Sequence, residues 1–160
     1  MDRSFFAVQG FLAEPRLPAS VATTTGRGNP ALAMMWFVAE EGRLWFHTPV
    51  SDGRPTPFLD AARGHREVAV MVATFDPPDD VRQVRMTGPA RLETKDVARV
   101  RRIYERYIPG WSPDWEDHAA SQDAVLWSMS PDRGMAVTYP GLANGPVFRW
   151  SNAAEGPFGS

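Results

Sequence analysis

Apolar residues along this chain come in short runs that are separated by glycine and proline. Residues 31–39 form a nearly continuous apolar run, which is too short for a comfortable helix and is bounded by turn signals, so it predicts a buried strand. A tight turn at Glu41-Gly42 leads into a second run over residues 44–48, and the two runs together predict a β-hairpin. Residues 81–93 read as one long strand in which Gly88-Pro89 predicts a bulge. The other expected strands cover residues 19–25, 67–74, 125–130 and 135–139, and the last two are partners across the turn at residues 131–134.

Helical spacing of apolar residues predicts helices at three places. A short helix over residues 5–12 ends before Pro15, and a second begins at Pro57, whose missing N–H would have no partner in a first turn. The third covers residues 97–107 after an N-cap at Thr94, with a short continuation over residues 113–119. About six strands that are joined mostly as hairpins predict a largely antiparallel sheet. Because several strands are apolar on both faces, we expect this sheet to curl round its own core with the helices outside.

Length and composition limit the class of protein. A chain of 160 residues predicts a single domain over residues 1–160, in which the Gly-Pro-rich residues 140–160 form an extended, flexible tail. No run reaches the roughly 18 apolar residues of a membrane span, and the N-terminus does not read as a signal peptide, so we expect a cytoplasmic protein that does not engage membranes. The net charge of -2 argues against a nucleic-acid binder. The absence of cysteine excludes thiol nucleophiles, thiolate metal sites and disulfides.

Searches for catalytic motifs leave the catalytic residues unknown. The chain has no dinucleotide fingerprint, P-loop, His-Glu-x-x-His or Gly-x-Ser-x-Gly. His47 and His65 are more typical of structural or surface positions than of catalysis. A cluster of carboxylates and one histidine could hold a metal, although a solvated acidic segment is the more frequent case, and we expect no metal site; the cluster comprises Asp114, Glu116, Asp117 and His118.

A few residues suggest a site for a flat, phosphorylated cofactor. Met34, Met35 and Trp36 could flank a flat ring, although core packing is the more common role of such side chains. Arg54 precedes a helix, where a guanidinium suits phosphate, although a surface arginine is the more common case. The Gln83 amide offers a donor and an acceptor to the edge of a ring, although a glutamine at a sheet edge is equally ordinary.

Aromatic residues stand in segments that have little local core. Trp111, Trp115 and Trp150 are such residues, and exposed apolar patches of this kind usually cover an interface. We therefore expect a homodimer.

The order of these elements, together with Arg82-Gln83-Val84 leading to Gly88 and Ala90, resembles the pyridoxamine 5'-phosphate oxidase-like superfamily of flavin-binding split barrels. The late turn at Ser130-Pro131-Asp132-Arg133 is also similar, and the resemblance covers roughly residues 5 to 139. It implies a mainly β, α+β fold: a six-stranded antiparallel split β-barrel with flanking helices. It also implies a homodimer with two FMN molecules at its interface. The residues that it assigns to the cofactor are Met34, Met35 and Trp36 along the ring, Thr48 and Arg54 at the phosphate, and Gln83 at the ring edge, with Arg149 and Trp150 reaching a site in the other subunit.

The sequence also departs from authentic pyridoxamine phosphate oxidases. Ala33 stands where those enzymes place an arginine, Gly53 replaces one of two adjacent basic residues before Arg54, and the C-terminal motif that grips the vitamer is absent. We therefore expect an FMN-dependent oxidoreductase that transfers hydride to or from a small molecule other than the vitamer. The alternatives are an F420-dependent reductase of the same fold and a non-catalytic protein that binds flavin or haem.

Overall fold

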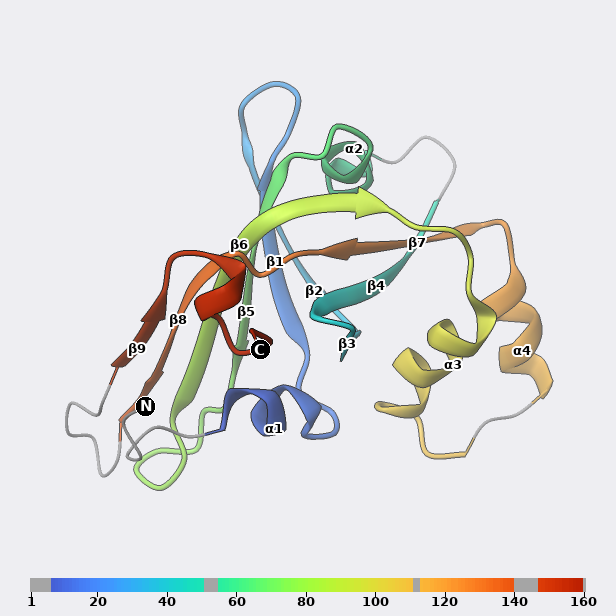
Figure 1. Cartoon of the computed structure of the whole chain (residues 1–160). Helices are drawn as coiled ribbons and strands as arrows, with labels where there is room; N and C mark the ends of the chain where they lie inside the picture. The colour runs from blue at the N-terminus through green and yellow to red at the C-terminus, as the bar shows by residue number, and fades with distance from the viewer. Residues whose placement is uncertain (1–6, 51–54, 111–112, 140–146, 160) are drawn as a thin grey trace.

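The computed structural model describes residues 7–50, 55–110, 113–139 and 147–159. These residues form nine strands in one antiparallel sheet, four α-helices and a 3-10 turn (Figure 1). The strands are β1 (Ala19–Thr24), β2 (Pro30–Met35), β3 (Phe37–Glu40), β4 (Arg43–Pro49), β5 (Glu67–Ala73), β6 (Arg82–Leu92), β7 (Ala124–Met129), β8 (Arg133–Thr138) and β9 (Val147–Trp150). The helices are α1 (Val8–Ala13), α2 (Pro57–Arg63), α3 (Val97–Glu105), α4 (Pro113–Ala120) and the 3-10 turn η2 (Ala153–Glu155). The antiparallel barrel with flanking helices is confirmed, but the sheet has nine strands where we expected about six.

The long strand β6 joins the two halves of the sheet. It pairs with β5 along most of its length, while its other edge pairs first with β8 and then with β7. Its register with β5 is unbroken from Gln83 to Pro89, so the predicted bulge is wrong. Gly88 is needed for another reason: a Cβ there would collide with the Ser130 carbonyl oxygen, where the chain passes from β7 to β8. The predicted β7–β8 hairpin is also wrong, because the two strands follow one another along the same edge of β6.

The apolar run over residues 31–39 is two strands and not one. β2 pairs with β1 and β3 pairs with β4, so the chain leaves one half of the barrel at Trp36 and enters the other. The Tyr107 hydroxyl accepts the Phe37 N–H at 3.2 Å, and the Arg106 guanidinium donates to the Phe37 carbonyl. These contacts satisfy backbone groups that the break would otherwise leave unpaired, so the break avoids the free-energy cost of buried unpaired N–H and C=O groups. β2 is also not buried, since Leu32 is 75% exposed and Met34 is 72% exposed.

The helices lie around the ends and one side of the barrel. α1 and α2 lie at opposite ends of the sheet, and α3 and α4 lie together beyond β3 and β4 (Figure 1). α2 starts at Pro57 as predicted and buries four apolar side chains. α3 packs on β4 over a small apolar cluster that includes Trp45, Val100, Ile103 and Tyr104. Its N-cap is Asp96 and not Thr94, because the Asp96 carboxylate accepts the Arg99 N–H at 3.1 Å.

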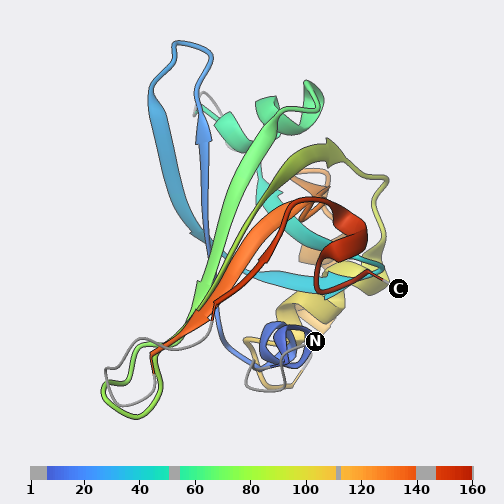
Figure 2. The same cartoon turned by 60° about the vertical axis from the view of Figure 1, so that its left-hand side comes forward.

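The C-terminal residues that we expected to be an extended tail include a ninth strand. β9 pairs with β8 on the outer side of the sheet (Figure 2). Trp150 is 4% exposed, and its indole N–H donates to the Pro131 carbonyl at 2.9 Å, so it is not the exposed aromatic residue that we expected. Gly134 lies directly beneath the Trp150 ring, and a Cβ at this position would collide with that ring. Trp115 is half-buried against α3, and Trp111 lies outside the described residues.

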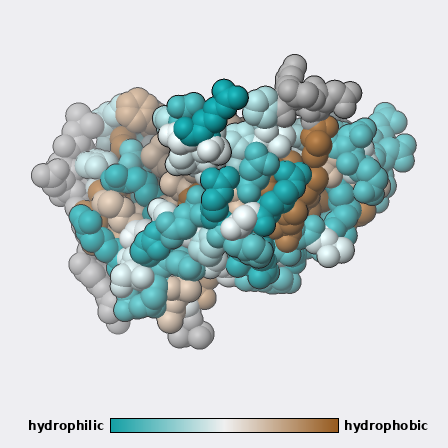
Figure 3. Space-filling model, turned by 90° about the horizontal axis from the view of Figure 1, so that it is seen from above, coloured by the Kyte–Doolittle hydropathy of each residue, from teal (hydrophilic) through white to brown (hydrophobic). Residues whose placement is uncertain are grey.

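The surface around α2 is mainly polar. Seen from above, most residues are hydrophilic; the most strongly hydrophobic ones form a band on the right of the view, and smaller hydrophobic spots lie elsewhere (Figure 3). Among the described helices, none is both long enough and apolar enough to cross a membrane.

Candidate functional site

A pocket of about 450 Å³ lies where the chain crosses from β2 to β3. We call it the aromatic pocket. The strands contribute Met34, Met35, His47, Thr48 and Pro49, the break between β2 and β3 contributes Trp36, and the helices contribute Ile103, Tyr104, Trp115 and His118. The fold therefore brings together four of the residues predicted to bind a cofactor, namely Met34, Met35, Trp36 and Thr48. Its volume lies within the range of small-molecule sites.

Trp36 is held in place by two tyrosines of the α3 region. Its ring stacks on Tyr107 with a centroid distance of 4.9 Å and an angle of 12° between the planes. It also meets Tyr104 edge-on at 5.7 Å. Because Tyr107 also accepts the Phe37 N–H, the strand break and the position of Trp36 depend on the same side chain.

Thr48 has a fixed hydrogen-bonding role. The indole N–H of the fully buried Trp127 lies 2.7 Å from Thr48 Oγ1. An indole nitrogen can only donate, so the Thr48 oxygen accepts and its own hydrogen is left to donate elsewhere. A hydroxyl held in this way suits an anionic or carbonyl oxygen.

His47 lies between Lys95 and Tyr104. Lys95 Nζ is 2.6 Å from His47 Nε2, and His47 Nδ1 is 3.0 Å from the Tyr104 hydroxyl oxygen. Burial, together with the charge of Lys95 and the nearby His118, lowers the pKa of His47 from 6.5 to about 4. Burial raises the pKa of Tyr104. At neutral pH the pocket therefore contains a neutral imidazole and a protonated phenol.

α3 is fastened to the β3–β4 turn by a buried arginine. The Arg99 guanidinium pairs with Glu40 and Glu41, each at 2.9 Å, and lies 3.7 Å above the centroid of the Trp45 ring. Hydrogen bonds from Arg102 and Arg99 lower the pKa of Glu40 against the opposing effect of burial. This cluster fixes α3 against the sheet, and so it fixes Tyr104 in the wall of the pocket.

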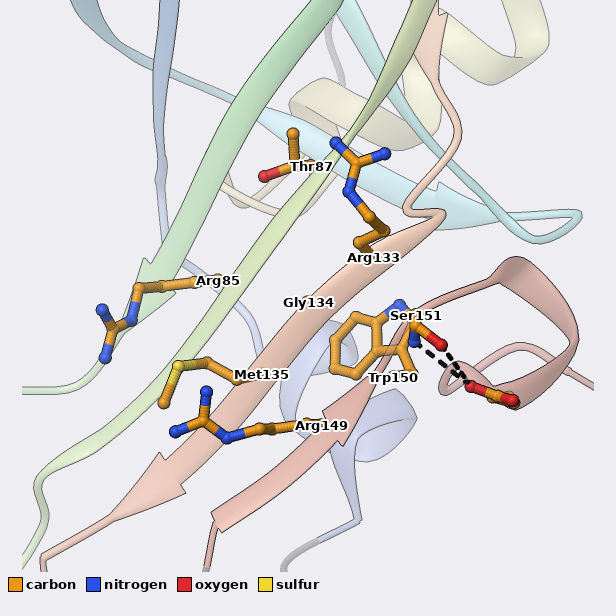
Figure 4. A pocket seen from close by; sticks show the side chains of 9 residues that line it. Arg85, Thr87, Arg133, Gly134, Met135, Arg149, Trp150 and Ser151 are labelled. Carbon is orange, nitrogen blue, oxygen red and sulfur yellow. Dashed lines mark hydrogen bonds between the residues drawn. The ribbon is translucent and has the colours of Figure 1, made fainter.

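A second cavity of about 500 Å³ lies on the outer face of β6, β8 and β9. We call it the arginine groove, after Arg85, Arg133 and Arg149, and Thr87, Met135 and Trp150 also line it. The guanidinium groups of Arg85 and Arg149 extend over the face on either side of Met135 (Figure 4). Arg133 pairs with Glu67 at 2.7 Å, whereas neither Arg85 nor Arg149 has an ion pair within the described part of the chain.

Strand register connects the two cavities. Residues paired across neighbouring strands share a face of the sheet, and one row of partners crosses all six strands of this half. The row runs Met34, Ser20, Met71, Arg85, Met135 and Arg149. Met34 lines the aromatic pocket and Arg149 lines the arginine groove, so this outer face joins one cavity to the other.

The remaining predicted residues lie apart from the aromatic pocket. Gln83 is half-buried on β6, two residues from Arg85, and lines neither cavity. Trp150 lines the arginine groove, and Arg54 lies outside the described residues. Their roles at a cofactor stay predictions. Within the described ranges, no group of three acidic, histidine or cysteine side chains is placed to hold a metal.

The residues that sequence reasoning missed are Lys95, Tyr104 and the pocket role of His47. They come from three separate elements, and a local pattern gives no sign that they meet. The one available signal was that Lys95 is the only lysine beside sixteen arginines. The presence of a single lysine does not reveal which residues Lys95 contacts.

Comparisons with known proteins agree on the fold and differ in function. The haem-storage protein HutZ from Vibrio cholerae superimposes with a TM-score of 0.62 at 16% identity, covering 84% of this chain and 94% of that one. A protein related to general stress protein 26, of the pyridoxinephosphate oxidase family, from Clostridium acetobutylicum gives 0.61 at 15% identity, covering 94% and 96%. An F420 reductase gives 0.54 at 23% identity, covering 76% and 90%. No curated protein matches the sequence.

At these identities the structural neighbours show the fold alone, and the sequence supplies the family. Residues 7–137 match the family described as pyridoxamine 5'-phosphate oxidase, a match that begins just before α1 and ends within β8. This chain therefore belongs to the pyridoxamine 5'-phosphate oxidase-like split-barrel superfamily.

Proposed function

We propose that this chain is an FMN-dependent oxidoreductase that transfers hydride to or from a small molecule, with the ring of the cofactor in the aromatic pocket. The observation that carries the proposal is the meeting of Met34, Met35, Trp36 and Thr48 in one cavity. These residues come from the end of β2, the break that follows it and β4, and the resemblance to flavin-binding split barrels had assigned all four to the cofactor.

The lining of the pocket fits a flavin. Trp36, Tyr104 and Trp115 provide flat apolar surfaces for a planar ring. Thr48 presents a donor, and the oxygens of a flavin ring and of its phosphate are acceptors. When bound, the flavin supplies the hydride chemistry, while the chain binds and orients the reactants and excludes water. A deazaflavin of the F420 type has a similar planar ring, so it is the alternative cofactor for the same pocket.

Haem binding is a second candidate, and His118 favours it. Its imidazole is exposed at the edge of the pocket, with a centroid distance of 5.5 Å to Tyr104 and 6.1 Å to Trp115. Histidine is an axial ligand of haem iron in many haem proteins. His47 is unsuited to that role, because both of its ring nitrogens already have partners.

We also propose that the protein is a homodimer that packs through the outer face of β2, β1 and β5. Leu32 and Met34 are 75% and 72% exposed, and Met71 is in the same row as Met34. Contiguous apolar surface on a sheet face is typical of an interface.

In such a dimer, Gln83 and Arg149 on the continuation of this face are candidates to reach the cofactor of the other subunit. Sedimentation should give a dimer at micromolar concentration, and Leu32→Glu with Met71→Glu should give a monomer; a monomeric wild type would contradict the proposal.

The visible spectrum of the purified protein, with mass spectrometry of what it releases on denaturation, tests the cofactor directly. Titration of the emptied protein with FMN, F420 and haemin then ranks the three. Trp36→Leu removes one wall of the pocket and should weaken FMN binding by about tenfold, since aromatic stacking contributes about 0.5–1.5 kcal/mol. Phe75→Leu is the matched control, because Phe75 is 83% exposed and lines neither cavity. Tight binding of haemin that depends on His118, without binding of FMN or F420, would favour the second candidate.

A further inference from the structure

The hydrogen bonds of Lys95 fix the proton on His47. Lys95 Nζ lies 3.0 Å from the Ser121 carbonyl oxygen, 2.8 Å from the Ala124 carbonyl oxygen and 2.6 Å from His47 Nε2. An ammonium group has three N–H donors and no acceptor. The two carbonyls and the imidazole nitrogen therefore each accept one hydrogen, and Nε2 itself carries none.

The position of this hydrogen also determines the direction of the hydrogen bond between His47 and Tyr104. A neutral imidazole has a single N–H, and with Nε2 unprotonated this hydrogen is on Nδ1. Nδ1 lies 3.0 Å from the Tyr104 hydroxyl, so Nδ1–H donates and the phenol oxygen accepts. The hydrogen of the phenol is consequently directed away from His47.

We propose that Tyr104 is the proton donor of the aromatic pocket and that Lys95 and His47 are positioning residues that hold it in that role. The inference rests on the proposed oxidoreductase function. It adds a substrate class: a flat unsaturated compound whose carbonyl oxygen takes up a proton when hydride is added to carbon.

Among the groups that line the pocket, Tyr104 is the one suited to this chemistry. None of the lining residues is a carboxylate. His47 has both ring nitrogens engaged, and His118 is exposed at the edge. Tyr104 is 8% exposed, and the rings of Trp36, Trp115 and His118 surround it. A proton held at such a position is shielded from solvent by the pocket's own walls.

The reduction of a conjugated enone illustrates the proposed chemistry. Hydride forms a C–H bond at the far alkene carbon, the π pair shifts toward the carbonyl, and the carbonyl oxygen takes the Tyr104 proton. The phenolate left on Tyr104 keeps the hydrogen bond from His47 Nδ1–H and regains a proton from water. The reductant is the reduced flavin, which is oxidised as the enone is reduced.

The first test needs no cofactor. Long-range proton–nitrogen NMR of the wild-type protein at pH 7 should show the hydrogen of His47 on Nδ1, with His65 as a reference in the same spectrum. Lys95→Met should abolish this preference. A wild-type protein with the hydrogen on Nε2 would overturn the proposal, and this measurement does not depend on the variant folding.

The second test separates proton transfer from electron transfer. In anaerobic single turnovers, protein loaded with reduced FMN is mixed with cyclohexenone, which takes up a proton, or with ferricyanide, which takes only electrons. Tyr104→Phe should slow the first reaction by roughly a hundredfold or more, the range of general acid catalysis, and leave the second unchanged. Tyr139→Phe is the matched control, because Tyr139 lines neither cavity and should behave as wild type.

The outcomes separate the inference from the function on which it rests. Equal rates for Tyr104→Phe and wild type with cyclohexenone would overturn the role of Tyr104 while leaving the oxidoreductase intact. A wild-type protein that binds neither FMN nor F420 would reject the proposed function, and with it the role of Tyr104 as a proton donor to substrate.

Discussion

The aromatic pocket and the arginine groove hold their polar groups in different ways. In the pocket, buried Trp127 fixes the Thr48 hydroxyl and Lys95 fixes His47. In the groove, Arg85 and Arg149 extend from the outer face of the sheet (Figure 4). A strand determines the side on which a residue lies, but not the direction in which a long side chain points. The pocket is therefore preorganised for one ligand geometry, whereas the groove supplies positive charge with little geometric selection.

The largest effect should come from the arginine that fastens the pocket wall. Arg99→Leu removes a buried cation that pairs with Glu40 and Glu41, while Glu40 keeps Arg102 as a partner. We expect the free energy of unfolding to fall by about 2–3 kcal/mol, somewhat less than for a buried pair that loses its only partner. Chemical denaturation measures this loss. Arg101→Leu breaks an exposed pair with Glu105 and should lower the free energy of unfolding by less than about 1 kcal/mol. Equal losses for the two variants would contradict the role of Arg99 in fastening α3 to the β3–β4 turn.

A smaller loss should follow from adding one methyl group in the groove. Gly134→Ala places a Cβ against the Arg85 carbonyl oxygen and the Trp150 ring, so β9 and Trp150 must shift. Overpacking of this kind costs about 1–3 kcal/mol. The expected signature is a red shift of tryptophan fluorescence together with a lower midpoint of denaturation. Gly26→Ala is the control, since nothing lies within 4 Å of its added Cβ; a Gly134→Ala protein as stable as this control would show that β9 can move aside freely.

Acid should weaken the pocket through His47. The groups that face this imidazole are Lys95, Tyr104 and His118. Its pKa is about 4 in the folded protein and 6.5 ordinarily, so between these values the unfolded chain binds a proton that the folded chain does not. Stability therefore falls as the pH drops from about 6.5 to about 4, by about 2 kcal/mol once screening of a half-buried group is allowed for. Unfolding measured across this range should show a smaller pH dependence in His47→Gln; identical slopes would mean that His47 titrates alike in both states.

The smallest effect concerns charge in the groove. The positive charge of the groove should attract anions weakly, and pyrophosphate serves as the anionic probe. Arg85→Gln should weaken its binding about threefold at low salt and hardly at all at high salt, because the guanidinium is exposed and its charge is screened. Isothermal titration at two ionic strengths measures the difference. Arg27→Gln, in the turn between β1 and β2, is the control. A loss that persists at high salt would indicate that the groove holds its arginines as rigidly as the pocket holds its hydroxyls.

Local sequence signals predicted the elements whose ends are determined locally. Pro57 fixed the start of α2, and the apolar runs located β4, β5 and β6 to within about two residues. The break at Trp36 was missed because Arg106 and Tyr107, about seventy residues away, satisfy the backbone there. The β7–β8 hairpin was wrong for a similar reason, since both strands are held by β6 and not by each other.

The candidate site likewise has residues that could be predicted from the sequence and contacts that could not. Met34, Met35, Trp36 and Thr48 could be named from the sequence because the order of the elements around them resembles that of a known family. The contacts of His47 with Lys95 and Tyr104 could not, because they depend on how α3 and the loop before it pack on β4. Hydrogen-bond direction is decided by tertiary contacts, and a linear pattern does not contain them.

The pairing of β6 also has a consequence for the order in which the protein is made. β5 precedes β6 in the chain and can pair with it as soon as both have emerged from the ribosome. The other edge of β6 has to wait for β7 and β8, which are made only after α3 and α4. During that interval a strand of eleven residues with an apolar face has an open edge, the arrangement that promotes pairing between nascent chains. Arg82, Arg85 and Arg91, spaced along this strand, place positive charges on it that disfavour such pairing while synthesis continues.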